Sequence, residues 1–195
     1  MNKLEIKEIQ KGQLIVYAQI PIAFIVTSVL KVELVNNGLG GIILEEEPIE
    51  EPYKKNYDLP PHRGPIEWTS KYNIQNWGFF LAVVGSLALG AATVAFNTNG
   101  VNLLEGRKDL SVLWDIRVHP EHRRKGIGRS LFDHATNWSR IRECTQMKIE
   151  TQNINVTACN FYQKMGCTLG EIHRFAYQSD PEIKNEVMLN WFIDL

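Results

Sequence analysis

The stretch WDIRVHPEHRRKGIGRSLFDHA, residues 114–135, constrains the fold more than any other part of the sequence. Its first residues complete the segment LSVLWDIRV, whose length and apolar content predict a β-strand. From Ile127 onward, apolar residues recur at steps of three and four, which predicts an amphipathic helix of about four turns. The residues on the apolar face of this helix are Ile127, Leu131, Ala135, Trp138 and Ile141.

The turn between this strand and this helix concentrates positive charge in a chain whose net charge is only −1. The first N–H groups of a helix have no partners within the helix, and the helix dipole is positive there. Glycine lets a backbone approach a ligand closely. The turn is therefore typical of a phosphate or pyrophosphate site, with a solvated basic turn as the alternative. Its residues are Arg123, Arg124, Lys125, Gly126, Ile127, Gly128 and Arg129.

Two better-known phosphate motifs do not fit this turn. The P-loop requires Ser or Thr after a Gly-Lys pair, and neither follows here. The dinucleotide fingerprint requires a third glycine, but Leu131 stands at that position. If the turn binds a phosphate, we therefore expect a binding mode other than that of the P-loop or of the dinucleotide fingerprint.

The remainder of the chain predicts an α/β protein. Strands are expected at 4–9, at 78–97 with a turn near Gly85, at 146–153 and at 186–195. Residues 14–35 are expected to pack in the core and to be interrupted near Pro21. The polar, proline-rich residues 36–65 predict a long connection, either a lid or a flexible loop. The length of 195 residues predicts a single domain, 1–195.

The composition argues against several other classes of protein. The 21 basic and 22 acidic residues are balanced, so we expect no nucleic-acid partner and no binding to an anionic membrane. The longest apolar stretch contains Gln19, Pro21, Lys31 and Glu33, which disfavours a transmembrane span. Three cysteines without a C-x-x-C pair disfavour disulfides and zinc and suit a cytoplasmic protein. No metal is expected, because the histidines that flank Pro120 fit a solvated turn.

A second segment, together with the basic turn, resembles the motifs of a known family. R-x-x-G-x-G between strand and helix, followed by ETQNINVTACNFYQKMGC, resembles the GNAT superfamily of acetyl-CoA-dependent N-acetyltransferases. The family's second motif matches here at Asn155, Ala158, Tyr162 and Gly166, and the resemblance covers about residues 113–169. It implies a GNAT-like fold, with a mixed and mostly antiparallel central sheet flanked by helices.

The resemblance also implies how acetyl-CoA is held. The backbone of Ile116, Arg117 and Val118 would pair with the pantetheine arm as a neighbouring strand does. The backbone N–H groups of residues 124–129 would bind the pyrophosphate, and the side-chain amide of Asn155 would bond the arm. Acetyl-CoA is the expected cosubstrate, and no metal is needed.

Three side chains are candidates for the chemistry. Tyr162 matches the family position that protonates the departing thiolate, although an aromatic residue at helical spacing often only packs. A lysine-like amine is almost entirely protonated at neutral pH, so a carboxylate base is expected. Glu150 is our candidate base, and Asp115 our candidate anchor for the substrate ammonium. The reverse assignment stays open, as does a solvated or paired role for either acid.

A closer resemblance suggests the substrate. DIRVHPEHRRKGIG and the ending EVMLNWFIDL are similar to the streptothricin acetyltransferase branch, whose members acetylate an amine of a cationic antibiotic. The alternatives are a protein N-terminus, a lysine or a polyamine as acceptor, or a non-catalytic acyl-CoA-binding protein. The acidic residues between 45 and 51 either steer a polycation or are merely solvated. A homodimer is left open.

Overall fold

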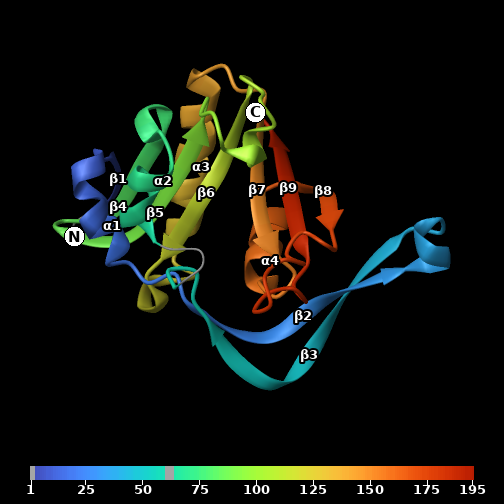
Figure 1. The fold of residues 1–195 in the computed structure, drawn as a ribbon. Helices are drawn as coiled ribbons and strands as arrows, with labels where there is room; N and C mark the ends of the chain where they lie inside the picture. Colours follow the sequence, from blue (N-terminus) through green and yellow to red (C-terminus); the bar gives the residue numbers. More distant parts are fainter. Residues whose placement is uncertain (1–2, 60–63) are drawn as a thin grey trace. The chain divides into compact units, whose positions relative to one another are not determined.

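The structure, a computed structural model, describes residues 3–59 and 64–195 (Figure 1). It contains a seven-stranded sheet in the order β1-β4-β5-β6-β7-β9-β8 and a separate two-stranded ribbon, β2-β3. The pairs β1–β4, β4–β5, β5–β6 and β8–β9 are antiparallel, whereas β6 and β7 are parallel. The predicted α/β class, with a mixed and mostly antiparallel sheet flanked by helices, is confirmed.

The strands are β1 Leu4–Glu8, β2 Phe24–Leu34, β3 Ile42–Lys55, β4 Gly78–Val84, β5 Leu87–Phe96, β6 Leu110–Val118, β7 Gln146–Gln152, β8 Thr168–His173 and β9 Met188–Asp194. The helices are α1 Leu14–Ala18, α2 Trp68–Lys71, α3 Ile127–Ile141 and α4 Val156–Lys164. Among the described residues, no helix is long and apolar enough to cross a membrane.

The chain divides into two compact units. Unit 1 contains the described residues up to Ala23, together with Asn56–Ile149 and Ile193–Leu195. Unit 2 contains Phe24–Lys55 and Glu150–Phe192. Strand β7 therefore begins in unit 1 and ends in unit 2, and the predicted site residues are divided between the two units. The prediction of a single domain over 1–195 stays a prediction.

In unit 1, the predicted strand and helix around the basic turn are both present. Strand β6 coincides with LSVLWDIRV, and α3 spans Ile127–Ile141 and packs against β4, β5 and β6. Four of its five predicted core residues are buried. The prediction is wrong for Ile141, which is 71% exposed because it is the last residue of the helix.

A cluster of aromatic residues joins α1 and α2 to the sheet of unit 1. The rings of Tyr17 and Trp68 meet edge to face at 5.6 Å, and Trp77 lies 5.1 Å from Trp114 between ring centroids. The segment NWGFF contributes to the core, since residues 77–80 are buried. This aromatic cluster anchors the short helix α1, which carries Tyr17 into the site described below.

The prediction of a loop or lid over residues 36–65 is wrong for residues 42–55. Ile42–Lys55 form the long strand β3, which pairs with β2, and residues 60–63 lie outside the described residues. Prolines disfavour a central strand because they lack an N–H donor, but a two-stranded ribbon consists of edges that tolerate them. Pro48 faces Ser28 at an irregularity in the pairing, and Lys31 bonds Glu47 across the ribbon at 2.8 Å.

In unit 2, Asn153 connects three segments just beyond β7. Its backbone exchanges hydrogen bonds with Leu30 of β2 and Val187 before β9, and its side chain bonds the same two residues. Helix α4 follows and ends before Gly166, whose φ of 89° is typical of a glycine that terminates a helix. Strand β8 was not predicted.

Candidate active site

The basic turn opens helix α3 as predicted. Gly126 is the N-cap residue, with φ 84°, in the left-handed region that favours glycine. A Cβ atom at this position would meet open space, so the glycine is required by the backbone angle and not by crowding. No side chain caps the helix, and its first N–H groups are oriented for a ligand. Arg124, Lys125 and Arg129 are exposed beside them.

Arg123 has a different position from its neighbours. Its guanidinium donates to the carbonyl oxygen of Val118 at 3.1 Å and to that of Ala23 at 2.9 Å. Burial of this side chain lowers the pKa of Arg123. Its side chain therefore fixes the turn to the end of β6, and its backbone N–H donates to the carbonyl oxygen of Pro120.

Strand β6 leaves part of one edge open within the described residues of unit 1. On one side, Ile116, Arg117 and Val118 pair with β5. On the other side, the parallel pairing with β7 covers only Leu110–Val112. The register also shifts at Trp114, where β6 has one more residue than β5, as in a β-bulge. Beyond Val112, the backbone of β6 thus has the open edge that strand-like binding of a ligand requires.

Asp115 lies in a buried network of hydrogen bonds. Tyr17 donates its hydroxyl to Asp115 Oδ1 at 2.7 Å. Arg117 donates to both carboxylate oxygens, at 2.9 Å from Nε and 2.7 Å from Nη2. The same guanidinium donates to both oxygens of Asp58, at 2.9 and 3.0 Å. The exposed fractions of the three charged side chains are 7% for Asp115, 1% for Arg117 and 25% for Asp58.

The charges of this network stabilise one another. Burial opposes the charge on Arg117, but the Asp115 carboxylate outweighs it and raises the pKa of Arg117. Burial and the same carboxylate raise the pKa of Tyr17 well above its usual value. Asp115 is therefore an internally paired acid, and its role as an anchor for an ammonium stays a prediction. Tyr17 and Asp58 were not predicted from the sequence, where the i, i+2 spacing of Asp115 and Arg117 is the one local sign of this network.

The predicted base and acid lie in unit 2. Glu150 is on β7, partly buried, and accepts a hydrogen bond from the Tyr177 hydroxyl at 2.7 Å. Tyr162 is on α4 and is 5% exposed, with its ring centroid 5.5 Å from that of Phe161. Asn155 caps α4, because its side-chain oxygen accepts from Ala158 N at 3.2 Å, which leaves its NH₂ group for a ligand.

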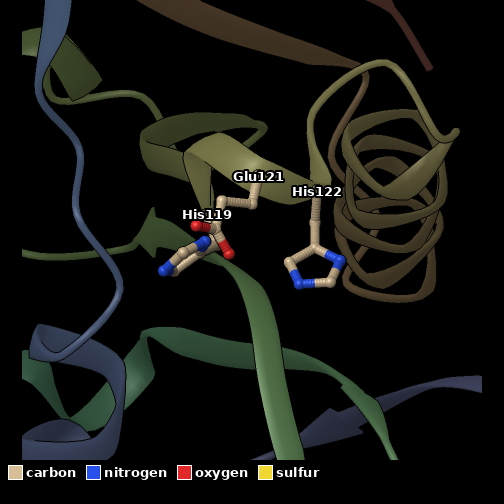
Figure 2. A group of neighbouring side chains, drawn as sticks. All are labelled: His119, Glu121 and His122. Atoms are coloured by element: carbon tan, nitrogen blue, oxygen red, sulfur yellow. The ribbon is translucent and has the colours of Figure 1, made fainter.

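One group of side chains could in principle hold a metal ion. His119, Glu121 and His122 surround the short turn before Arg123, and Figure 2 shows the Glu121 carboxylate beside the His119 ring. The possible ligand atoms lie within 4.8 Å of one another. His119 Nδ1 is buried without a hydrogen-bond partner in the described structure. The reaction considered below uses no metal.

Comparison with known proteins identifies the family. Residues 44–167 match the model of the acetyltransferase (GNAT) family, which is most of the chain. The chain therefore belongs to this family of acyltransferases, whose acetyl donor is acetyl-CoA.

Individual relatives of the chain include streptothricin acetyltransferases. The chain is 29% identical to streptothricin acetyltransferase A of Bacillus subtilis over 148 residues, which are 75% of this chain and 76% of that protein. It is 40% identical to a streptothricin acetyltransferase of Escherichia coli over 84 residues, 43% of this chain and 48% of that protein. The chain thus spans about half the length of the Escherichia coli relative.

Solved structures agree with the fold. A Bacillus anthracis protein assigned as a streptothricin acetyltransferase, solved in complex with acetyl coenzyme A, has a TM-score of 0.77 at 25% identity. The alignment covers 99% of this chain and all of that one. Nourseothricin acetyltransferase has a TM-score of 0.75 at 23% identity and covers 98% of both chains, which supports the fold alone.

Proposed function

We propose that this protein transfers an acetyl group from acetyl-CoA to a primary amine of a small cationic substrate, a streptothricin-type antibiotic. The observation that carries the proposal is the exposed basic turn at the uncapped start of α3, in a chain of the acetyltransferase family. The named relatives supply the substrate class. A cytoplasmic location and a homodimer stay predictions.

The residues of unit 1 fit the coenzyme. Helix α3 has Gly126 as its N-cap and no side-chain cap, and the first N–H groups of a helix are a favourable site for an anion. Exposed Arg124, Lys125 and Arg129 add positive charge at this helix end. On the edge of β6 that faces away from β5, Ile116–Val118 would offer backbone groups to the amide groups of the pantetheine arm, apart from the Val118 carbonyl oxygen, which accepts from Arg123. When bound, acetyl-CoA supplies the acetyl thioester.

The residues of unit 2 would supply the proton transfers. Glu150 accepts a proton from the substrate ammonium, directly or through water, and the free amine then attacks the thioester carbonyl carbon. As the carbon–sulfur bond breaks, Tyr162 donates its hydroxyl proton to the departing sulfur. The acetylated nitrogen loses its second proton, which returns through water to the Tyr162 oxygen, and Glu150 gives its proton to solvent. Asn155 holds the arm through its side-chain NH₂ group. The base is needed because an amine with a pKa near 10.4 is almost wholly protonated at pH 7.

Acidic side chains support the choice of a cationic substrate. The network in unit 1 contains two carboxylates and one guanidinium, and therefore has a net negative charge. On the ribbon β2–β3, Lys31 pairs with Glu47, but other glutamates of β3 remain exposed. Such a surface attracts polycations and raises their rate of encounter. The exposed acids of this ribbon are Glu45, Glu46, Glu50 and Glu51.

The proposal is tested by release of the coenzyme thiol from acetyl-CoA with a panel of amines. The panel contains streptothricin, an aminoglycoside, a polyamine and a peptide with a free N-terminus. We expect rapid release with streptothricin and little with the others. Rapid release with the peptide alone would instead identify a protein N-acetyltransferase, and no release with any amine would favour a non-catalytic acyl-CoA-binding protein.

Substitutions test the two catalytic roles. Glu150→Gln should lower kcat, and the loss should shrink at high pH, where more of the amine is already neutral. Tyr162→Phe keeps the ring and should lower kcat by on the order of 10²-fold with little change in stability. Full activity in Tyr162→Phe would show that the sulfur takes its proton from water.

A further inference from the structure

A chain of three polar side chains surrounds Glu150 in unit 2. Gln152 Nε2 donates to the Tyr177 hydroxyl oxygen at 2.8 Å, and the Tyr177 hydroxyl donates to Glu150 Oε1 at 2.7 Å. Gln152 Nε2 also lies 3.4 Å from the same carboxylate oxygen. Glu150 and Gln152 are two residues apart on β7, so their side chains lie on the same face of the strand.

The direction of the hydrogen bonds in this chain is fixed by Gln152. An amide NH₂ group is only a donor, so the Tyr177 oxygen acts as the acceptor toward it. The hydroxyl proton is then left for Glu150, which accepts it as a carboxylate. A hydroxyl bond to an ionised carboxylate is among the shorter and stronger hydrogen bonds. The chain therefore holds Glu150 in one orientation and favours its ionised form.

The segment that carries Tyr177 is itself attached to the end of β7. It connects β8 to β9, and Val187 near its end bonds both the backbone and the side chain of Asn153, one residue after Gln152. Glu186 pairs with Lys55 in a partly buried ion pair, and Ile183 is buried. Tyr177 thus belongs to a connection that is fixed at several points and not to a free loop.

We propose that Tyr177 is a positioning residue of the acetyl-transfer reaction, which holds the Glu150 carboxylate in the orientation and charge state of a general base. The proposal rests on the proposed function, in which Glu150 is that base. Tyr177 itself need not touch the substrate. Its effect resembles that of the groups that orient metal ligands, whose loss typically costs about 10- to 100-fold in activity.

The test is Tyr177→Phe, which removes the hydroxyl and keeps the ring. We expect kcat to fall by about tenfold or more, as for a misplaced catalytic group, while the KM for acetyl-CoA stays unchanged. The acid limb of the kcat/KM profile should move to higher pH, because the carboxylate loses a donor to its ionised form. The matched control is Tyr53→Phe on the ribbon of unit 2, where the ring is 44% exposed; it should change neither quantity.

A double-mutant cycle separates this role from a structural one. If Tyr177 acts through Glu150, then Tyr177→Phe should have no further effect on kcat in the Glu150→Gln background. Equal losses in both backgrounds would overturn the proposal, as would an unchanged kcat and pH profile in Tyr177→Phe alone. The failure of the proposed function has a different signature: the wild-type protein would then release no thiol from acetyl-CoA with any amine of the panel. A wild-type kcat in Glu150→Gln would instead remove only the role of Glu150 as the base, and with it the role of Tyr177.

Discussion

Replacement of Asp115 by Asn tests whether the buried network of unit 1 is primarily structural. The substitution keeps one oxygen, which can still accept from Tyr17 and from Arg117 Nε. It replaces the other oxygen with an NH₂ group that faces Arg117 Nη2, at a position where the carboxylate oxygen is 2.7 Å away. Two donors then oppose each other beside a guanidinium that is 1% exposed.

The expected cost follows from this geometry. Removal of one partner of a buried ion pair costs about 3–5 kcal/mol. We expect the lower end, about 3 kcal/mol, because Asp58 still compensates the guanidinium with two hydrogen bonds. For a protein of this size, such a loss lowers Tm by about 6–12 °C. The measurement is thermal unfolding without ligand, supported by urea unfolding at pH 7.

The matched control is Asp109→Asn. Asp109 also pairs with an arginine two residues away, Arg107, at 2.9 Å, but the two side chains are 47% and 35% exposed. Exposed ion pairs contribute little to stability, so this variant should unfold close to wild type. An unchanged Tm in Asp115→Asn would refute the structural role. If the KM for the cationic amine then rose ten- to a hundredfold with acetyl-CoA affinity intact, Asp115 would be the substrate anchor.

Three further predictions concern the turn, the thiols and unit 2. Gly126→Ala and Gly100→Ala introduce the same strain, because φ is 84° and 82° and the new Cβ atom meets open space at both positions, so both variants should lose similar stability. Only Gly126→Ala should weaken the rise in Tm that acetyl-CoA causes. An equal rise in both variants would contradict the assignment of the turn as the pyrophosphate site. Burial raises the pKa of both Cys159 and Cys167 to about 12, above the value in the unfolded chain. The contribution of these two thiols to the free energy of unfolding should therefore be constant below about pH 8.5 and fall as the pH rises from there toward 12. A free energy of unfolding that rises in that range would contradict this sign. Asn153→Ala removes the side-chain bonds to Leu30 and Val187 and should speed hydrogen exchange at both backbone N–H groups, so unchanged exchange would remove its bridging role.

The sequence was most informative where its signals were local. The helix α3, the strand β6 and the helix stop at Gly166 follow from periodicity and turn chemistry within a few residues. Strand β3 was predicted wrongly because its prolines and glutamates disfavour strands, and its partner β2 supplies the compensating cross-strand contacts.

Long-range contacts explain what the sequence could not show in the site. Strict alternation along a strand would place Asp115 on the face opposite Trp114. The register shift at Trp114 interrupts the alternation, so Trp114 packs against the aromatic cluster while Asp115 bonds Tyr17 of the same cluster. Tyr17 lies 98 residues from Asp115 in the sequence, and no local pattern connects them. The same holds for Tyr177 and Glu150, which are 27 residues apart.

The most direct test of the central claim is the mass of the product formed from streptothricin, acetyl-CoA and the purified protein. We expect a single added acetyl group on a streptothricin amine, formed at a rate that Tyr162→Phe and Glu150→Gln each reduce strongly. Unmodified streptothricin after prolonged incubation, with acetyl-CoA bound but not consumed, would contradict it.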